Sequence, residues 1–184
     1  QEVSDRLASL SALVPGMLYQ MRVAPDGSTS VPYASAGISD LFGFTPEQVA
    51  EDATAMWQRV DPADAPVAQE SMTEAVRSGT RWHQRLRMRN GAGETRWFLT
   101  DATTEADPPD GVMLHGLLTD VTDEVEVAEQ MRISASVFAS TRDGIIIMSP
   151  DGTILDVNPG FVALTGYTSD DVRGRTLEIL GSGL

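Results

Sequence analysis

Polar and apolar residues alternate over several stretches of the chain, and this alternation predicts β-strands. In the clearest stretch, residues 80–89, apolar side chains share one face with Gln84, while Arg and His side chains occupy the other. Turn signals separate neighbouring strands at 25–28 and at 90–93. The polar, proline-containing stretch 105–111 is expected to form a loop. The expected strands are residues 17–23, 31–34, 80–89, 96–100 and 112–121.

Apolar residues three and four positions apart predict helices in other stretches. Residues 3–14 form a loose apolar stripe, and short helices are expected between 35 and 78, the longest at 66–78. A longer helical pattern begins at Thr122, and its acidic start suits a helix N-terminus. Its apolar positions, spaced like the seam of a short coiled coil, are Val125, Ala128, Met131 or Arg132, Ala135 and Phe138.

The pattern near the start of the chain occurs a second time. Residues 144–168 repeat the order of strand, turn, strand and short helix found in 17–45, and Gly166 follows Gly43 by 123 residues. The second copy reaches Leu184 without a counterpart of the strands at 80–121. Because two strands and a few short helices are marginally stable alone, we expect this copy to be partly disordered or completed by a second chain.

Composition narrows the possible chemistry. The chain has no Cys, two His and 13 basic residues, all of them Arg. The lack of Cys and Lys excludes disulfides, thiolate metal sites, cysteine nucleophiles and Schiff-base chemistry, and two His disfavour a histidine-built metal site. Nothing in the sequence assembles a nucleophile, a base and an orienting group. We therefore assign no catalytic and no metal-binding residues.

The strong negative charge bears on the possible partners. With 27 acidic residues the net charge is −14, which argues against binding to nucleic acid or to an anionic membrane surface. The row of Arg side chains at 81–96 is expected to pair with the acidic linker or with a partner subunit. No run of roughly 18 apolar residues and no signal peptide is visible, so we expect a cytoplasmic location without membrane contact by these residues, although the parent protein could be anchored in a membrane through another part.

Several motifs together resemble the PAS domain family. The first copy is similar to it in Val14-Pro15-Gly16, Leu41-Phe42-Gly43-Phe44-Thr45-Pro46, Val60-Asp61-Pro62-Ala63-Asp64 and Asp120-Val121-Thr122; the second in Asp143-Gly144-Ile145 and Val157-Asn158-Pro159. The resemblance implies an α+β fold, a five-stranded antiparallel sheet with short helices on one face. The expected division is an N-terminal helix at 1–14, a PAS domain at 15–122, a coiled-coil-like linker helix at 123–140 and the N-terminal half of a second PAS domain at 141–184.

The resemblance implies a sensory and signal-relay input module of a larger bacterial signalling protein, with no enzyme activity of its own. The signal would pass from the sheet through the linker helix to an output domain. A cyclic-di-GMP enzyme is the first choice for that domain, because residues 177–183 resemble a segment common before such domains, and a histidine kinase is the second. The alternative is a ligand-free PAS dimerisation module with a structural role. A homodimer is expected through the N-terminal and linker helices.

Asp120 and Thr122 occupy the place of the family's sheet-to-helix coupling motif. Asp120 can accept a charged hydrogen bond, and Thr122 can cap the departing helix. The simpler interpretation is that Thr122 only caps the helix. Capping is compatible with a role in coupling the sheet to the helix.

Members of the family bind haem, flavins, small carboxylates or no ligand. The flavin chemistry of light-oxygen-voltage domains is excluded because Leu177 stands where the reactive cysteine would be. Haem is disfavoured because the helix at 66–78 contains no His, and His83 and His115 are expected at the surface or in the core. The ligand is unknown, and a filled core or a small ligand is favoured. The candidate pocket residues are Tyr19, Met21, Trp57, Met72, Trp82, Gln84, Leu86 and Met88.

Overall fold

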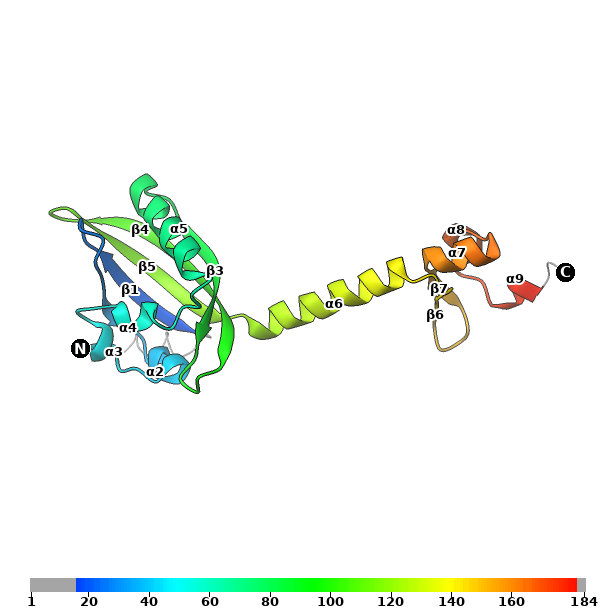
Figure 1. Cartoon of the computed structure of the whole chain (residues 1–184), viewed down its shortest axis with the longest axis horizontal. Coiled ribbons are helices and arrows are strands. Elements are labelled where there is room, and N and C mark those ends of the chain that lie inside the picture. Colours follow the sequence, from blue (N-terminus) through cyan, green and yellow to red (C-terminus); the bar gives the residue numbers. More distant parts are fainter. Residues whose placement is uncertain (1–15, 182–184) are drawn as a thin grey trace. The chain divides into compact units, whose positions relative to one another are not determined.

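A computed structural model of the chain describes residues 16–181, and the expected N-terminal helix at 1–14 lies outside them. The chain divides into two units, the first ending at Val125 and the second beginning at Glu126. Each unit contains one antiparallel sheet, and the helix that follows the first sheet carries the chain into the second unit (Figure 1).

The sheet of the first unit has five strands in the order β2-β1-β5-β4-β3. β1 pairs with β5 along its whole length, so the first and last strands of the unit lie side by side. Tyr19 of β1 stands opposite Gly116 of β5. The strands are β1 (Met17–Val23), β2 (Thr29–Ala34), β3 (Trp82–Arg89), β4 (Thr95–Asp107) and β5 (Gly111–Asp120).

The strand β4 is longer than the sequence pattern indicated. The expected loop at 105–111 was wrong over 105–107 and at 111, because Glu105 and Asp107 pair with Met113 and Gly111 of β5. An ion pair between Arg22 Nε and Asp107 Oδ2, 2.5 Å apart, joins the end of β4 to β1. Hydrogen bonds to a neighbouring strand satisfy the backbone of this polar stretch, whatever its side chains are. Polarity alone therefore did not indicate a loop.

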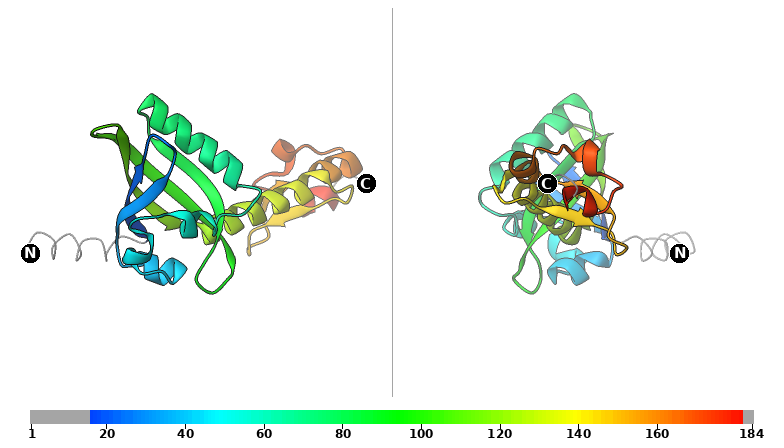
Figure 2. Two further views of the ribbon diagram at one scale, coloured as in Figure 1. Left: turned by 60° about the vertical axis from the view of Figure 1, so that its left-hand side comes forward. Right: turned by 90° about the vertical axis from the view of Figure 1, so that its right-hand side faces the viewer.

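Short helices lie against one face of this sheet (Figures 1 and 2). Thr45 begins α3 with a capping box shared with Gln48, and Pro46 occupies the first turn. Gly43 ends α2 and Gly79 ends α5, both with a positive φ that suits glycine. The helices are α2 (Gly37–Phe42), α3 (Pro46–Val49), α4 (Thr54–Trp57) and α5 (Ala65–Ser78).

The core of the first unit lies between these helices and the inner face of the sheet. Alternate residues of each strand point into it, as the pleat requires. Phe42 of α2 and Phe98 of β4 are both fully buried, with ring centroids 5.1 Å apart. Such a pair adds about 0.5–1.5 kcal/mol to the stabilisation from area burial. It fixes α2 against the middle of β4.

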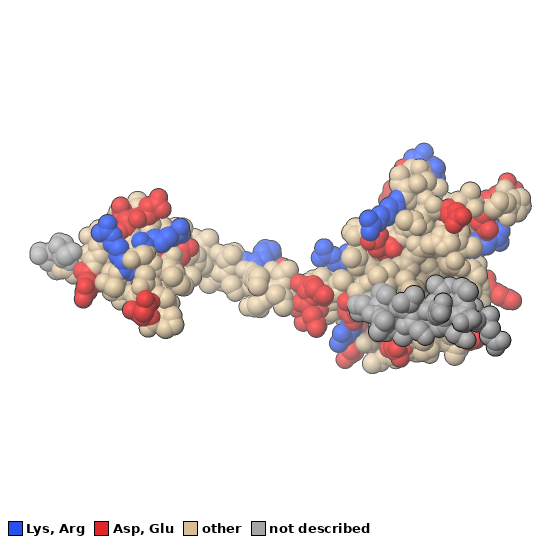
Figure 3. All heavy atoms as spheres, turned by 180° about the vertical axis from the view of Figure 1, so that it is seen from behind, with Lys and Arg blue, Asp and Glu red and all other residues tan. Residues whose placement is uncertain are grey.

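The helix α6 (Thr122–Ser140) follows β5 after a single residue. Acidic side chains gather where it begins (Figure 3). Its described side chains include no buried residue, and Val127, Met131 and Val137 are exposed over more than half of their surface. Within residues 16–181, no helix combines the length and the apolar character needed to cross a membrane.

The second unit contains the hairpin of β6 (Ile146–Met148) and β7 (Ile154–Val157), followed by α7 (Pro159–Thr165), α8 (Ser169–Val172) and α9 (Glu178–Gly181). Its buried apolar residues each lie 123 positions after a buried residue of the first unit. The pairs are Val31 with Ile154, Ala34 with Val157, Ile38 with Phe161, and Val49 with Val172. The repeat in the sequence is therefore a repeat of the core.

A hydrogen bond at the start of each hairpin repeats as well. In the first unit the Leu18 amide donates to Ser35 Oγ over 3.1 Å. In the second the Ile145 amide donates to Asn158 Oδ1 over 2.7 Å, and Ser35 and Asn158 are again 123 positions apart. Both side chains are buried, so each supplies a partner that the backbone would otherwise lack.

Candidate functional site

An apolar cavity of about 60 Å³ lies between the inner face of the sheet and the helices of the first unit. All five strands contribute residues on the sheet side, and α2, α4 and the residues next to α4 contribute them on the helix side. The residues that line it are Met17, Tyr19, Met21, Val31, Ile38, Ala53, Met56, Trp57, Val60, Trp82, Leu86, Met88, Thr100 and Leu118.

The sequence pattern named six of these lining residues. They are Tyr19, Met21, Trp57, Trp82, Leu86 and Met88. Met17, Val31, Thr100 and Leu118 were missed, although alternation along their strands could have indicated them, and Ile38 of α2 was missed as well. Ala53, Met56 and Val60 were also missed, and no periodic signal marks them, because they belong to a short irregular stretch around α4.

Two of the predicted pocket residues lie outside the cavity. Met72 of α5 is buried in the core and also lines an open groove on the surface. Gln84 shares a face of β3 with Trp82 and Leu86, but its side-chain amide donates to the backbone carbonyl of Arg85 over 2.8 Å. Alternation along a strand fixes the face on which a side chain lies. Whether that side chain reaches the cavity depends on what packs above it.

The wall of the cavity is entirely apolar, and the polar atoms of its lining side chains, a pair of hydroxyl groups and two indoles, are directed to other partners. Tyr19 Oη and Thr100 Oγ1 are 2.5 Å apart, and both residues are buried. Burial raises the pKa of Tyr19 to about 12, so the phenol is neutral throughout the physiological range. The indole N–H groups of Trp57 and Trp82 donate to Thr29 Oγ1 and Ser71 Oγ over 3.1 and 3.0 Å.

Neither haem nor a flavin fits this cavity as the structure shows it. An engineered protein cavity of about 150 Å³ holds one benzene ring, and 60 Å³ is less than half of that volume. Each of these cofactors has several fused rings. Leu177, at the position of the reactive cysteine in the resembling motif, belongs to the second unit and is 43% exposed.

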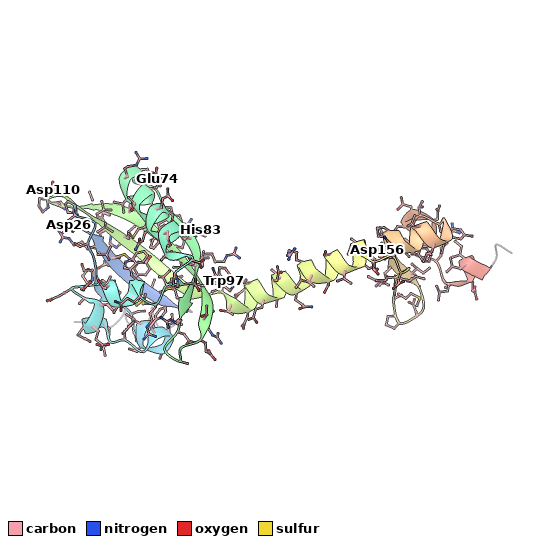
Figure 4. All side chains as sticks on the ribbon, viewed as in Figure 1. Asp26, Glu74, His83, Trp97, Asp110 and Asp156 are labelled. Atoms are coloured by element: carbon pink, nitrogen blue, oxygen red, sulfur yellow. The ribbon has the colours of Figure 1, made fainter. Side chains whose placement is uncertain are left out.

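Both histidines lie on the outer face of the sheet, away from the cavity. His83 is exposed on β3, with its Nδ1 3.5 Å from Asp101 (Figure 4). His115 of β5 lies between Gln20, 3.2 Å from its Nδ1, and Glu105, 2.9 Å from its Nε2. Among the described residues, no three His, Cys, Asp or Glu side chains come close enough together to hold a metal ion.

Three Arg side chains of the row at 81–96 pair with acidic residues of the first unit, namely Arg81, Arg87 and Arg96. Arg81 pairs with Asp101 of the neighbouring strand, and Arg87 pairs with Asp64 before α5, with 2.6 Å between Nη2 and Oδ1. The expectation that this row pairs with the linker or a partner subunit was therefore wrong for Arg81, Arg87 and Arg96. Hydrogen bonding to Arg87, which outweighs the effect of burial, lowers the pKa of Asp64.

The junction between sheet and helix is held by a compact hydrogen-bond network. Thr122 Oγ1 donates to Asp120 Oδ1 over 2.5 Å, and the Thr122 amide donates to the same oxygen. The Trp97 amide of β4 donates to Thr122 Oγ1 over 3.0 Å, and the Val121 amide donates to the Trp97 carbonyl. Trp97 thus joins β4 to the first residue of α6 (Figure 4).

Asp120 carries the charge of this network. Arg96 of β4 donates to Asp120 Oδ2 over 3.1 Å. Partial burial raises the pKa of Asp120, but the hydrogen bonds from Thr122 and Arg96 outweigh burial and lower the pKa below its usual range. The carboxylate therefore stays ionised at neutral pH and can hold the strand end and the helix start together.

Comparison with known proteins agrees with this geometry. The family described as PAS fold matches residues 31–115, and the family described as PAS domain matches residues 142–181. No curated protein matches the sequence.

Solved structures share the fold at low sequence identity. A sensory box histidine kinase/response regulator from Burkholderia thailandensis has 15% identity and a TM-score of 0.51, over 72% of this chain and 95% of that one. A domain of a light and redox sensing histidine kinase from Haloarcula marismortui has 18% identity and a TM-score of 0.50, over 64% and 99%. These likenesses show the fold, and the two family matches show that the chain belongs to the PAS domain family.

Proposed function

We propose that the chain is the sensory input and relay module of a larger signalling protein, in which a change in the first unit's sheet is passed on through α6. PAS domains are regulatory sensor modules, and the two matches cover both units. The observation that carries the proposal is the network at the junction, where the first residue of α6 is bonded to β4 and to the end of β5.

The network gives a physical route for the relay. Asp120 is the last residue of β5 and stands opposite Phe98 of β4. Because only Val121 separates β5 from α6, no flexible segment can absorb a shift between strand and helix. A displacement of β4 relative to β5 changes the positions of Trp97 and Asp120, and the N-terminus of α6 moves with them. The amide of Thr122, the first residue of α6, donates to Asp120, so Asp120 rather than the Thr122 hydroxyl caps the helix. The same contacts would carry the coupling.

The exposed apolar side of α6 is the proposed dimer contact. Ala128, Met131, Ala135 and Phe138 recur at the three- and four-residue spacing of a coiled-coil seam. Met131 is 68% exposed, so a partner helix would remove its side chain from water. In a two-fold dimer of this kind, the relay would change the relative rotation or tilt of two α6 helices.

For the output, a cyclic-di-GMP synthesising or degrading domain is the first proposal and a histidine kinase the second. The support for the former is the sequence resemblance of residues 177–183 to a segment common before such domains. A ligand-free dimerisation module is the alternative to a sensor. Its support is the small size of the cavity, which leaves the core of the first unit almost filled.

A spin-label experiment tests the relay. The chain lacks Cys, so Val137→Cys gives a single labelling site on an exposed position of α6. In the dimer we expect Thr122→Val to shift or broaden the distance distribution between the two labels. Thr103→Val serves as the matched control, because Thr103 lies exposed on β4 with no bond to the junction. Equal distributions in the Thr122 and Thr103 variants would refute coupling through this network.

A further inference from the structure

We propose that an open groove on the surface of the first unit binds a neutral saccharide. The groove lies between the turn that joins β1 to β2, the helix α4 and the helix α5, and its volume is about 580 Å³. Binding sites for small molecules usually measure about 300–1,000 Å³. The size of the groove, its apolar floor, its polar groups and its charge lead to this proposal, which does not depend on the proposed relay.

Two large apolar side chains, Trp57 and Met72, line the groove. Met72 is buried in the core, whereas Trp57 is only partly buried. The Trp57 ring also contacts Trp82, with ring centroids 6.5 Å apart, and Trp82 lines the inner cavity but not the groove. A sugar ring carries C–H groups on its faces and hydroxyl groups around its edge. It therefore packs best against an apolar surface that is surrounded by polar groups, and the groove has this composition.

The two walls on either side of Trp57 are fixed to each other by hydrogen bonds. Trp57 Nε1 donates to Thr29 Oγ1 of β2 over 3.1 Å. The amide of Ala53, the residue before α4, donates to the Thr29 carbonyl over 2.9 Å. The indole and the start of α4 are thus held in place before any ligand arrives. Such preorganisation reduces the entropy that is lost on binding.

The polar groups of the groove offer both donors and acceptors. Gln58 and Gln69 are exposed, and in the part of the chain that the structure describes neither side-chain amide has a hydrogen-bond partner. Each amide supplies two N–H donors and one acceptor oxygen. The Thr54 hydroxyl donates to Asp52 Oδ1 over 2.6 Å. The Thr73 hydroxyl donates to the Gln69 carbonyl over 2.8 Å, so both hydroxyl oxygens remain as acceptors. A sugar hydroxyl donates and accepts at once, which suits this mixture.

The charge of the groove favours a neutral ligand. Among its described lining residues, Asp52 alone is charged, and the hydrogen bonds from Thr54 lower the pKa of this carboxyl group. An anionic ligand would find no Arg in the described lining, and the net charge of −14 would repel it. A cationic ligand would pair with a single solvent-exposed carboxylate, and such a pair contributes little. A sugar hydroxyl can donate to the same carboxylate without the loss of a charged group's hydration.

NMR of the indole N–H groups in the isotope-labelled full chain can test this proposal. The chain has three Trp residues, of which Trp57 lines the groove and Trp97, which lies outside it, serves as the internal control. The neutral probes are glucose, galactose, maltose and trehalose. The charged probes are glucuronate, which has the ring of glucose with a carboxylate, and choline, which is a cation. We expect a saturable shift of the Trp57 signal with at least one neutral sugar, a smaller shift with either charged probe and no shift of the Trp97 signal.

A pair of matched variants locates the bound sugar. Gln69→Ala removes one amide from the groove and should weaken binding of the sugar about 3- to 10-fold, the effect of one hydrogen bond. Gln130→Ala makes the same change at an exposed position of α6, outside the groove, and should leave the affinity unchanged. Because the Gln69 side chain is exposed and has no hydrogen-bond partner among the described residues, the fold is expected to persist in both variants.

Each other outcome overturns the inference in a defined way. The absence of a Trp57 shift with all four sugars would show that the groove binds no ligand of this class. Equal or larger shifts with glucuronate or choline would refute the preference for a neutral ligand. Equal shifts of the Trp57 and Trp97 signals would indicate a general solvent effect instead of binding. Equal affinities of the Gln69 and Gln130 variants would place the sugar outside the groove. The spin-label test of α6 is independent of all these results.

Discussion

Gly116 of β5 occupies a position where even one methyl group would collide with the candidate site. It stands opposite Tyr19 in the register of β1 and β5. A Cβ atom built on Gly116 would lie 2.5 Å from Cζ and 2.6 Å from Oη of Tyr19. Such distances are far below van der Waals contact, so the buried Tyr19 ring must shift, and the free space next to it is the small cavity that it lines. We predict that Gly116→Ala displaces this ring and breaks its bond to Thr100.

The size of the effect follows from three contributions. Overpacking a filled core costs about 1–3 kcal/mol. Loss of the Tyr19–Thr100 hydrogen bond, 2.5 Å long and buried, costs about 0.5–1.5 kcal/mol. Replacing glycine by alanine reduces the conformational entropy of the unfolded chain, which raises the free energy of unfolding by about 0.4–1 kcal/mol. The net expectation is a loss of about 2–3 kcal/mol in the free energy of unfolding, a large share of the stability of an ordinary domain.

Tryptophan fluorescence during urea unfolding measures this loss for the first unit alone, because all three Trp residues, at 57, 82 and 97, belong to it. The control is the same substitution in a Tyr19→Leu background, in which the ring that the methyl group would meet is absent. There, Gly116→Ala should cost less than 1 kcal/mol or stabilise slightly. A similar loss in both backgrounds would show that the collision with Tyr19 is not the cause.

Three further results are expected. Because the bond to Arg87 lowers the pKa of Asp64 in the folded state, this carboxylate stabilises the fold above the unfolded pKa of about 4, and that contribution is lost as the pH falls from there through the lowered folded-state pKa. Asp64→Asn should therefore flatten the acid limb of the stability profile, with Asp110→Asn, in the exposed turn between β4 and β5, as the control. Met131→Glu places a charge in the proposed seam of α6 and should convert the dimer to a monomer in analytical ultracentrifugation, whereas Arg132→Glu, beside the seam, should have a smaller effect. If the Met131 and Arg132 variants dimerised equally well, the proposed seam would be contradicted. Limited proteolysis should cut residues 126–184 before 17–121, because their buried apolar core is far smaller, and equal resistance of the two would contradict this reasoning.

Local sequence signals were sufficient for features that depend on one segment or on its immediate neighbours. The alternation in β3 indicated its two faces, and a face buried against helices must be apolar. The spacing of 123 residues indicated the repeat, because the same buried positions recur in both units. The bond between Asp120 and Thr122 could also be foreseen, because the two residues are only two positions apart. Asp and Thr side chains commonly form such local hydrogen bonds.

Other features depend on which segments lie side by side, and the sequence pattern contains no such information. The polar end of β4 became a strand only because β5 pairs with it there. Arg87 pairs with Asp64, and not with the acidic linker, because the start of α5 lies beside β3. The cavity is a volume that remains between packed elements: Ala53 and Met56 reach it from an irregular stretch, while Gln84, on the expected face, does not. Periodicity determines the direction in which a side chain points, and only the tertiary packing determines what it meets.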